Sequence, residues 1–229
     1  MPVFVLSKKI SFPPQSFAEG NGLIAIGGDL SPERLIASYR MGIFPWYSDG
    51  DPILWWTPDP RLVLFPKELH TPRSLEKVIR KNYFDVTVDH DFKSVIQSCS
   101  DVHKEKNKGT WIVKEMIEAY VKLHQMGYAH SIETWRHGRL VGGLYGVSMG
   151  KCFFGESMFS TESDASKVAL VYLVRVLLEH SFELIDCQMT TRHLARFGAR
   201  EIQRAEFIRR LNSALDSDQP PQSWQMKLT

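Results

Sequence analysis

The chain has 229 residues, of which 43% are hydrophobic and 24% are charged, and its formal net charge is +2. These proportions are those of an ordinary folded protein and exclude a disordered chain. Because the chain is nearly neutral, its overall field is too weak to attract a nucleic acid, so such a partner would need a local basic patch.

Cysteine and histidine spacings favour a reduced protein without a metal. The three cysteines, Cys99, Cys152 and Cys187, form an odd set with no C-x-x-C pair, and none of the eight histidines has a paired ligand spacing. The longest apolar run, residues 168–178, contains Arg175 and is too short to cross a bilayer, and the N-terminus lacks the pattern of a signal peptide. We therefore expect a cytoplasmic protein with no membrane segment.

Turn-forming residues dominate residues 1–60, and only one helix is expected there. It begins at Pro32, after Ser31 as the N-cap, and ends near Gly42. Regular strands and helices follow. We therefore predict a small N-terminal domain, residues 1–60, and a larger catalytic domain, residues 61–229.

Strands and helices alternate at the beginning of the larger domain. Two strands are expected, at residues 62–65 and 84–88. Three helices are expected, at residues 72–81, 92–99 and 114–126.

Three strands with short connections then predict an antiparallel meander, at residues 128–135, 140–147 and 152–159. A long helix follows, from its N-cap Ser163 to His180. Because this helix is apolar around most of its girth, we expect it to pack against the meander.

One more strand, residues 182–187, and two helices, at residues 193–198 and 204–214, complete the chain. This order is similar to that of the Gcn5-related N-acetyltransferase (GNAT) fold, so the predicted class is α+β with a GNAT-like larger domain. Acetyl-coenzyme A enzymes of that fold hold pyrophosphate on a glycine-rich turn at the start of the long helix. Residues 159–164 contain no glycine and two acids, which disfavours a phosphate there.

Three polar residues are candidates for chemistry. Asp186 and Gln188 are two apart in a strand and so are expected on the same face, and Glu156 lies inside an otherwise apolar strand. A buried carboxylate costs several kcal/mol unless it is paired or hydrogen-bonded. Each residue taken singly could be a structural ion pair or a hydrogen-bond anchor, whereas three converging polar groups favour a site.

Apolar neighbours of these residues would form the wall of a substrate pocket. They are Leu144, Phe153, Phe154, Met158 and Ile185. Simple core packing is the alternative for each of them. Gly155 allows a bulge that would turn Phe153 and Glu156 toward the same cavity.

The helix at residues 72–81 has a basic side and an apolar side. Its basic residues are Arg73, Lys77, Arg80 and Lys81. Charged faces are usually only solvated, but four cations diluted by Glu76 alone would suit an RNA backbone.

Aromatic residues are dense before residue 60, and Trp111 follows later. The early ones include Tyr39, Phe44, Trp46, Tyr47, Trp55 and Trp56. Most are expected to pack in the core, and one or two at a cleft could stack on a terminal base.

Several long strings together resemble the bacterial leucyl/phenylalanyl-tRNA–protein transferase family. They are residues 22–30 (GLIAIGGDL), 42–46 (GIFPW), 54–61 (LWWTPDPR), 154–160 (FGESMFS) and 185–188 (IDCQ). The strings occur in the family's order over nearly the whole chain. Such an ordered set is far more specific than one short motif.

This resemblance implies an activity. Members transfer leucine or phenylalanine from aminoacyl-tRNA to the N-terminal Arg or Lys of acceptor proteins, form a peptide bond there and mark these proteins for N-degron degradation. It implies that no metal or coenzyme is used. We expect a monomer whose partners are charged tRNA and acceptor proteins, with no membrane.

The resemblance also implies roles by position. Glu156, Asp186 and Gln188 match the central polar residues, and the basic helix matches the tRNA-binding helix. The pocket for the amino-acid side chain matches Leu144, Phe153, Met158 and Ser160, and contacts near the tRNA 3′ adenosine match Trp46 and Trp111. Position 144 is often Met in the family, and Leu conserves its volume.

The ester of aminoacyl-tRNA is already activated, so the enzyme must mainly hold two substrates in line. We expect Asp186 to orient and polarise Gln188, and this pair to position the incoming amine and to receive its proton as it attacks the ester carbonyl. Proton removal through Asp186, water or the tRNA 2′-hydroxyl is the alternative. Glu156 is expected to fix the amino group or ribose of the donor.

Two other functions compete with this interpretation. A coenzyme A-dependent acetyltransferase conflicts with the missing glycine-rich turn. An RNA-binding module without catalysis explains the basic helix but leaves the three polar residues in an apolar sheet unexplained.

Overall fold

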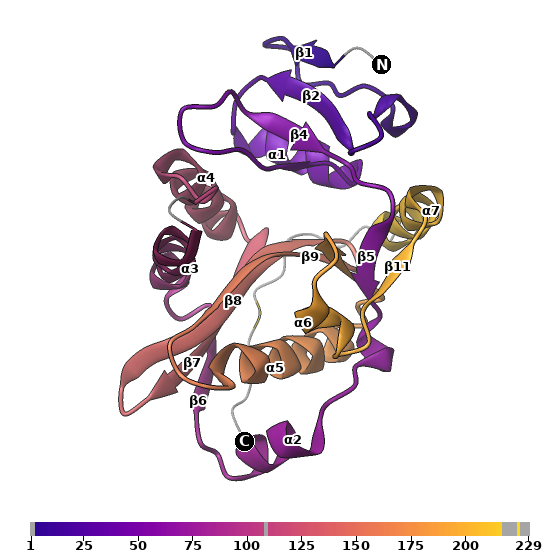
Figure 1. Cartoon of the computed structure of the whole chain (residues 1–229). Coiled ribbons are helices and arrows are strands. Elements are labelled where there is room, and N and C mark those ends of the chain that lie inside the picture. The colour runs from indigo at the N-terminus through magenta and orange to yellow at the C-terminus, as the bar shows by residue number, and fades with distance from the viewer. Residues whose placement is uncertain (1–2, 108–109, 217–223, 225–229) are drawn as a thin grey trace.

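Two β-sheets organise the part of the chain that the structure, a computed structural model, describes: residues 3–107, 110–216 and 224 (Figure 1). The first sheet has four strands in the order β1-β2-β4-β3 within these residues. The second has seven strands in the order β11-β5-β10-β9-β8-β7-β6. The chain passes from one sheet to the other between Trp56 and Arg61.

The N-terminal sheet was not expected from the sequence. Its strands are β1 (Phe4–Leu6), β2 (Leu23–Gly27), β3 (Phe44–Pro45) and β4 (Leu54–Trp56). They are too short and too closely flanked by turns to produce a periodic pattern. The one expected helix is confirmed as α1 (Pro32–Arg40), with Ser31 at its N-cap.

The large sheet contains the predicted meander. Its strands are β5 (Arg61–Leu64), β6 (Asp85–Val88), β7 (Ala129–Arg136), β8 (Arg139–Met149), β9 (Cys152–Ser160), β10 (Leu184–Gln188) and β11 (Arg200–Ile202). Strands β7, β8 and β9 pair antiparallel, whereas β10 pairs parallel to β9. The meander, the long helix, the parallel strand and the closing helix therefore occur in the predicted GNAT-like order, and β11 is an additional edge strand.

Helices cover both faces of the large sheet (Figure 1). They are α2 (Arg73–Arg80), α3 (Phe92–Asn107), α4 (Lys114–Gln125), α5 (Ala165–Glu179), α6 (Arg192–Ala195) and α7 (Arg204–Leu215), with short 3-10 turns η1 (Gln15–Phe17) and η2 (Pro66–Glu68). Helix α3 runs beyond the predicted end at Cys99, because Val102 still packs on the core and the Ser100 hydroxyl donates to the Ile112 carbonyl at 2.7 Å.

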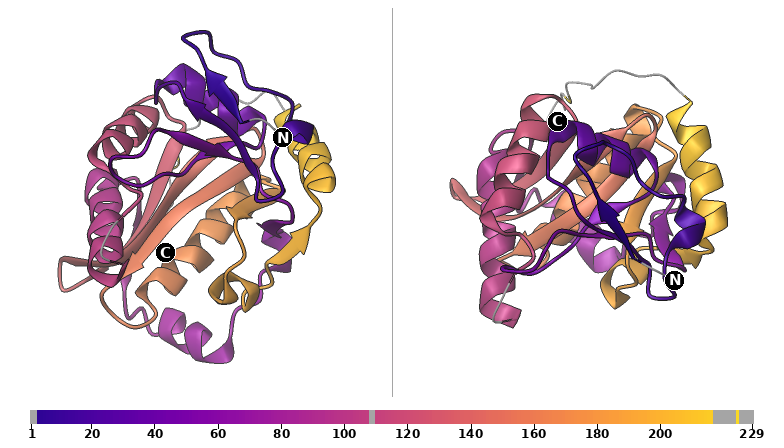
Figure 2. Two further views of the ribbon diagram at one scale, coloured as in Figure 1. Left: turned by 45° about the horizontal axis from the view of Figure 1, so that its top comes forward. Right: turned by 90° about the horizontal axis from the view of Figure 1, so that it is seen from above.

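Two apolar clusters hold these layers together. One lies between α5 and the large sheet. The other joins α3, α4 and the opposite face of that sheet to Tyr39 and Trp55 from the N-terminal region. Figure 2 shows the N-terminal region seated between α4 and α7, both of which contact α1. The division at residue 60 stays a prediction of domain organisation.

Candidate active site

A β-bulge sets the direction of the Glu156 side chain. Tyr145 pairs with Ser157 and Gly146 with Gly155, which leaves Glu156 without a partner across the β8–β9 ladder. A Cβ atom at Gly146 would lie 2.2 Å from the carbonyl oxygen of Phe154, so only glycine fits opposite the bulge. The bulge that the sequence allowed is therefore present.

This bulge also reverses the alternation of side chains along β9. Before it, Phe153 packs on the α5 side and Phe154 on the opposite side. After it, Met158 lies on the α5 side and Phe159 opposite. Simple alternation of side chains would place Phe154, Glu156 and Met158 on one face, but the extra residue shifts the period by one, so these three residues do not share a face.

Glu156 lies at the centre of a hydrogen-bonded cluster and is only 8% exposed. Tyr39 Oη donates to its Oε1 at 2.7 Å, Tyr120 Oη donates to its Oε2 at 3.0 Å, and Gln188 Nε2 donates to its Oε1 at 2.8 Å. The hydroxyls of Tyr39 and Tyr120 also hydrogen-bond each other. The carboxyl group is thus fixed by side chains from α1, α4 and β10.

Burial raises the pKa of Glu156 to about 7, although the donated hydrogen bonds act in the opposite direction, and the nearby charge of Asp186 adds to the increase.

Asp186 lies apart from this cluster. It is fully buried, and Arg61 donates to it through Nε at 2.8 Å and Nη2 at 2.6 Å. Its Oδ1 also accepts the backbone N–H of Gln188 at 2.9 Å. The structural ion pair that the sequence left open for each polar residue is present at Asp186, and its carboxylate does not line the cavity described below.

The β10–β5 ladder slips between Asp186 and Gln188, so the expected simple alternation of these two residues does not hold. Gln188 has a φ of 61°, in the left-handed region that residues other than glycine seldom adopt. Its backbone N–H is held by Asp186 and its amide by Glu156. Asp186 therefore orients Gln188 through the backbone.

Arg61, the ion-pair partner of Asp186, was not predicted from local sequence patterns. Its guanidinium group lies 4.8 Å from the ring centre of Phe44 and 4.6 Å from that of Phe207. Aromatic faces stabilise a cation that has lost its water. Arg61 thus links β5, β10 and α7 beneath the site.

An apolar cavity of about 470 Å³ opens beside Glu156 and Gln188. It is lined by seven of the predicted residues: Trp46, Trp111, Leu144, Phe153, Met158, Ser160 and Ile185. Phe154, which was also predicted for the pocket wall, packs in the core on the opposite side of the sheet instead. Residues from α5 and α6 complete the wall, among them Leu170, Leu173, His193 and Leu194. The structure thus brings together the predicted site residues of the sheet and rim except Asp186 and Phe154.

The predicted basic helix is α2, one residue shorter at each end than expected. Leu75 on its inner side is buried. Its four cations, Arg73, Lys77, Arg80 and Lys81, are all exposed. Figure 1 shows α2 at the opposite end of the molecule from the N-terminal sheet, and none of these four cations lines the cavity.

Neither a group of metal-ligating side chains nor a membrane-spanning helix is present in the described ranges. No three His, Cys, Asp or Glu side chains gather there as a metal ion would require. Likewise, no helix there is long and apolar enough to cross a bilayer.

Comparison with known proteins identifies two matching family models. The one described as leucyl/phenylalanyl-tRNA protein transferase matches residues 63–212, and the one described as the N-terminal domain of that transferase matches residues 28–59. A leucyl/phenylalanyl-tRNA–protein transferase of Syntrophobacter fumaroxidans is 55% identical over 98% of this chain and 96% of its own length. Another, of Solidesulfovibrio magneticus, is 52% identical over 100% of this chain and 93% of its own length.

Solved structures are similar only at a distance. A GCN5-related glucosamine N-acetyltransferase region of a fungal multi-domain protein has a TM-score of 0.45 and 8% identity, and the match covers 78% of this chain and 23% of that one.

Proposed function

Since the chain belongs to the leucyl/phenylalanyl-tRNA protein transferase family, we propose that its cavity holds the aminoacyl end of a charged tRNA while an acceptor protein's amino terminus attacks it. The protein is an aminoacyltransferase that moves leucine or phenylalanine from aminoacyl-tRNA to the N-terminal Arg or Lys of proteins, marking them for the N-degron pathway. One observation carries the proposal: an apolar cavity of about 470 Å³ has Glu156 and Gln188 in its wall.

The apolar wall suits the side chain of the donor. Leu144 and Met158 face each other across the β8–β9 ladder, and Phe153 and Ile185 pair across β9 and β10. A leucine or phenylalanine side chain there would exchange water for apolar contacts. Since one misplaced methyl group changes binding by roughly 1 to 3 kcal/mol, discrimination against valine and isoleucine is expected to be good but imperfect.

The two polar groups suit the reacting end of the donor. Ionised Glu156 is the counter-ion that we assign to the donor's α-ammonium group. Gln188 uses an amide N–H on Glu156 at 2.8 Å, and we assign its amide oxygen to the N–H of the incoming α-amino group. Asp186 is a positioning residue, because its contacts are to Arg61 and to the backbone of Gln188.

The transfer step needs orientation more than activation. The acceptor amine attacks the ester carbonyl, the C–N bond forms, and the ester C–O bond breaks. The proton of the amine goes to the departing ribose oxygen, through water or the 2′-hydroxyl. Asp186 is not part of this route, because its carboxylate is fully buried and paired with Arg61.

The rim and the basic helix suit the tRNA. Trp46, 36% exposed, and Trp111 offer ring faces on which the terminal adenine can stack. The exposed cations of α2 are assigned to phosphates farther along the acceptor arm. We also propose that the protein acts as a monomer, because one chain supplies all the groups assigned above. Its proposed location is the cytoplasm.

The test is the transfer of labelled leucine from leucyl-tRNA to a peptide beginning with Arg, with acetyl-coenzyme A as the control donor. The expected result is a leucyl peptide from the tRNA donor and no product from the coenzyme. Acetylation of the peptide without leucyl transfer would overturn the proposal. Tight tRNA binding without transfer would favour a binding module instead.

A further inference from the structure

A second cavity, of about 600 Å³, adjoins the first and shares Trp46, His103 and Trp111 with it. Most of its remaining wall comes from β4 and the loop between β3 and β4. Because the shared side chains form the partition, a group bound in one cavity lies next to the mouth of the other. The assignments above place the donor in the first cavity and leave the second without an occupant.

Two carboxylates line the second cavity. Asp49 and Asp51 both come from the β3–β4 loop, both are exposed, and neither forms an ion pair with another described residue. The backbone N–H of Asp51 donates to the Ser48 carbonyl at 3.0 Å, which holds the loop in a turn. The cavity therefore presents two unneutralised negative charges on an ordered loop.

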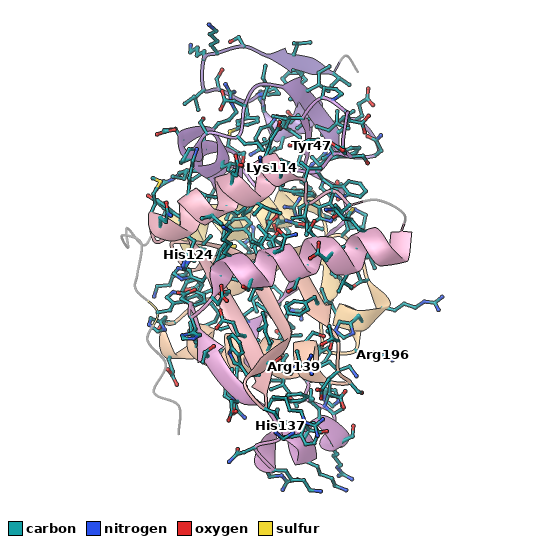
Figure 3. The ribbon with its side chains drawn as sticks, turned by 90° about the vertical axis from the view of Figure 1, so that its left-hand side faces the viewer. Tyr47, Lys114, His124, His137, Arg139 and Arg196 are labelled. Atoms are coloured by element: carbon teal, nitrogen blue, oxygen red, sulfur yellow. The ribbon has the colours of Figure 1, made fainter. Side chains whose placement is uncertain are left out.

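Tyr47, which also lines this cavity, is 6% exposed, and its buried hydroxyl has no hydrogen-bond partner among the described residues. Figure 3 shows it near Lys114, where the N-terminal region meets the start of α4. Burial, followed by the negative charges of Glu115 and Asp49, raises its pKa to about 12. A buried hydroxyl without a partner is costly, so a ligand that hydrogen-bonds it gains affinity.

Three tryptophan rings, Trp46, Trp56 and Trp111, also line this cavity. Trp46 and Trp56 lie 5.8 Å apart at 65° to each other, and Trp56 Nε1 donates to the Trp46 carbonyl at 2.7 Å. Tryptophan is the aromatic residue that binds a cation best. Carboxylates combined with fixed indole rings make a surface for a guanidinium or ammonium group.

We propose that the second cavity binds the cationic side chain of the acceptor's N-terminal Arg or Lys. This inference rests on the function proposed above, and it assigns the selection of the acceptor to Asp49, Asp51 and Tyr47. With its side chain held there, the acceptor's α-amino group is next to the partition and can cross it toward Gln188. The donor and the acceptor thus approach from opposite sides of the Trp46 and Trp111 rings.

The tRNA is a poorer occupant of this cavity. Two carboxylates repel phosphate groups, whereas proteins bind the phosphates of a nucleic acid with cationic side chains. The cations of α2 lie at the other end of the molecule (Figure 1). The same carboxylates attract the positive charge that Arg and Lys side chains both carry.

The test compares two peptides that differ only at the first residue, Arg or its uncharged analogue citrulline. We expect the wild-type protein to favour Arg, and the Asp49→Asn/Asp51→Asn variant to raise KM for the Arg peptide about tenfold while leaving the citrulline peptide and leucyl-tRNA unchanged. Asp85→Asn is the matched control, because Asp85 is exposed on β6 and lines neither cavity. It should leave all three constants unchanged.

Tyr47→Phe is the second variant. Because the buried hydroxyl has no partner in the described residues, its removal should not lower the unfolding midpoint. We expect KM for the Arg peptide to rise about threefold.

The outcomes separate this inference from the proposed function. If the double variant transfers leucine normally and still favours Arg over citrulline, the second cavity is not the acceptor site, although the transferase function stands. If the KM for leucyl-tRNA rises instead, the cavity belongs to the tRNA and the inference is wrong. If the wild-type protein transfers to neither peptide, the proposed function itself fails.

Discussion

Arg61 and Asp186 form an ion pair with two hydrogen bonds, of 2.8 and 2.6 Å, and their side chains are 1% and 0% exposed. The pair joins the first strand of the large sheet to β10, beneath the point where Gln188 leaves regular strand geometry. Removal of one partner would leave the other charged, buried and unpaired. The stability of the fold and the position of Gln188 therefore depend on the same contact.

Asp186→Ala is expected to lower the free energy of unfolding by about 3 to 5 kcal/mol, because Arg61 loses its counter-ion. Transfer should fall by well over tenfold in the protein that stays folded, while tRNA binding changes little. Urea unfolding and steady-state transfer measure the two effects. The double variant Arg61→Met/Asp186→Leu separates them, since it removes both charges. Its stability should recover and its activity should not. Recovery of both would mean that Asp186 has only a structural role.

The larger sheet could be predicted because its signals are local. Strands β7, β8 and β9 run for eight to eleven residues and are joined by glycine-containing turns, and α5 is apolar around most of its girth. The N-terminal strands have two to five residues, so no period of two develops. That sheet exists because tertiary contacts select it, and such contacts leave no local pattern.

The pocket wall could likewise be predicted, because Phe153 and Met158 lie within one strand around Gly155. The side chains that pair with the carboxylates of Glu156 and Asp186 could not be predicted. Tyr39 is 117 residues from Glu156 in the sequence, and Arg61 is 125 residues from Asp186. Tyr39 fitted the buried side of α1, and nothing nearby distinguished it from a core tyrosine. Its hydroxyl is seen to donate to Glu156 only in the folded structure, where α1 meets β9.

Glu156 should make the wild-type protein less stable as pH rises. Its ordinary pKa of 4.5 increases to about 7 in the folded protein, so between these values the folded state holds a proton that the unfolded state has lost. The free energy of unfolding should therefore fall across this window, by on the order of 3 kcal/mol, and level off above it. Denaturant titrations from pH 4.5 to 8 measure the change. Glu156→Gln is the reference. Toward low pH, the difference in the free energy of unfolding between the two proteins should become constant. A pH-independent difference would contradict the buried, proton-holding state of Glu156.

Tyr120→Phe should shift the pH dependence of transfer to higher pH. The Tyr120 hydroxyl donates to Glu156, and this hydrogen bond lowers the pKa of that carboxyl group. Without it, less Glu156 is ionised at pH 7, where we expect transfer to fall about three- to tenfold, with a smaller loss at pH 8.5. Tyr145→Phe is the matched control, because the Tyr145 hydroxyl is buried near the same cluster without a hydrogen-bond partner in the described residues. Equal losses at both pH values in Tyr120→Phe would rule out the assigned role of ionised Glu156.

The basic face of α2 should act on tRNA affinity alone. Arg80 and Lys81 are exposed at the end of the helix and line neither cavity, so neutralising both to Gln should weaken tRNA binding without changing the transfer rate at saturating tRNA. Each lost phosphate contact reduces the slope of log affinity against log salt by about 0.7 to 0.9, so the double variant should flatten it by roughly 1.5. Filter binding between 50 and 200 mM salt measures the slope. Lys122→Gln on α4, also exposed, is the control for an unspecific change of charge. If this control flattens the slope as much per charge removed, the protein's overall charge governs tRNA affinity and α2 has no special part in it.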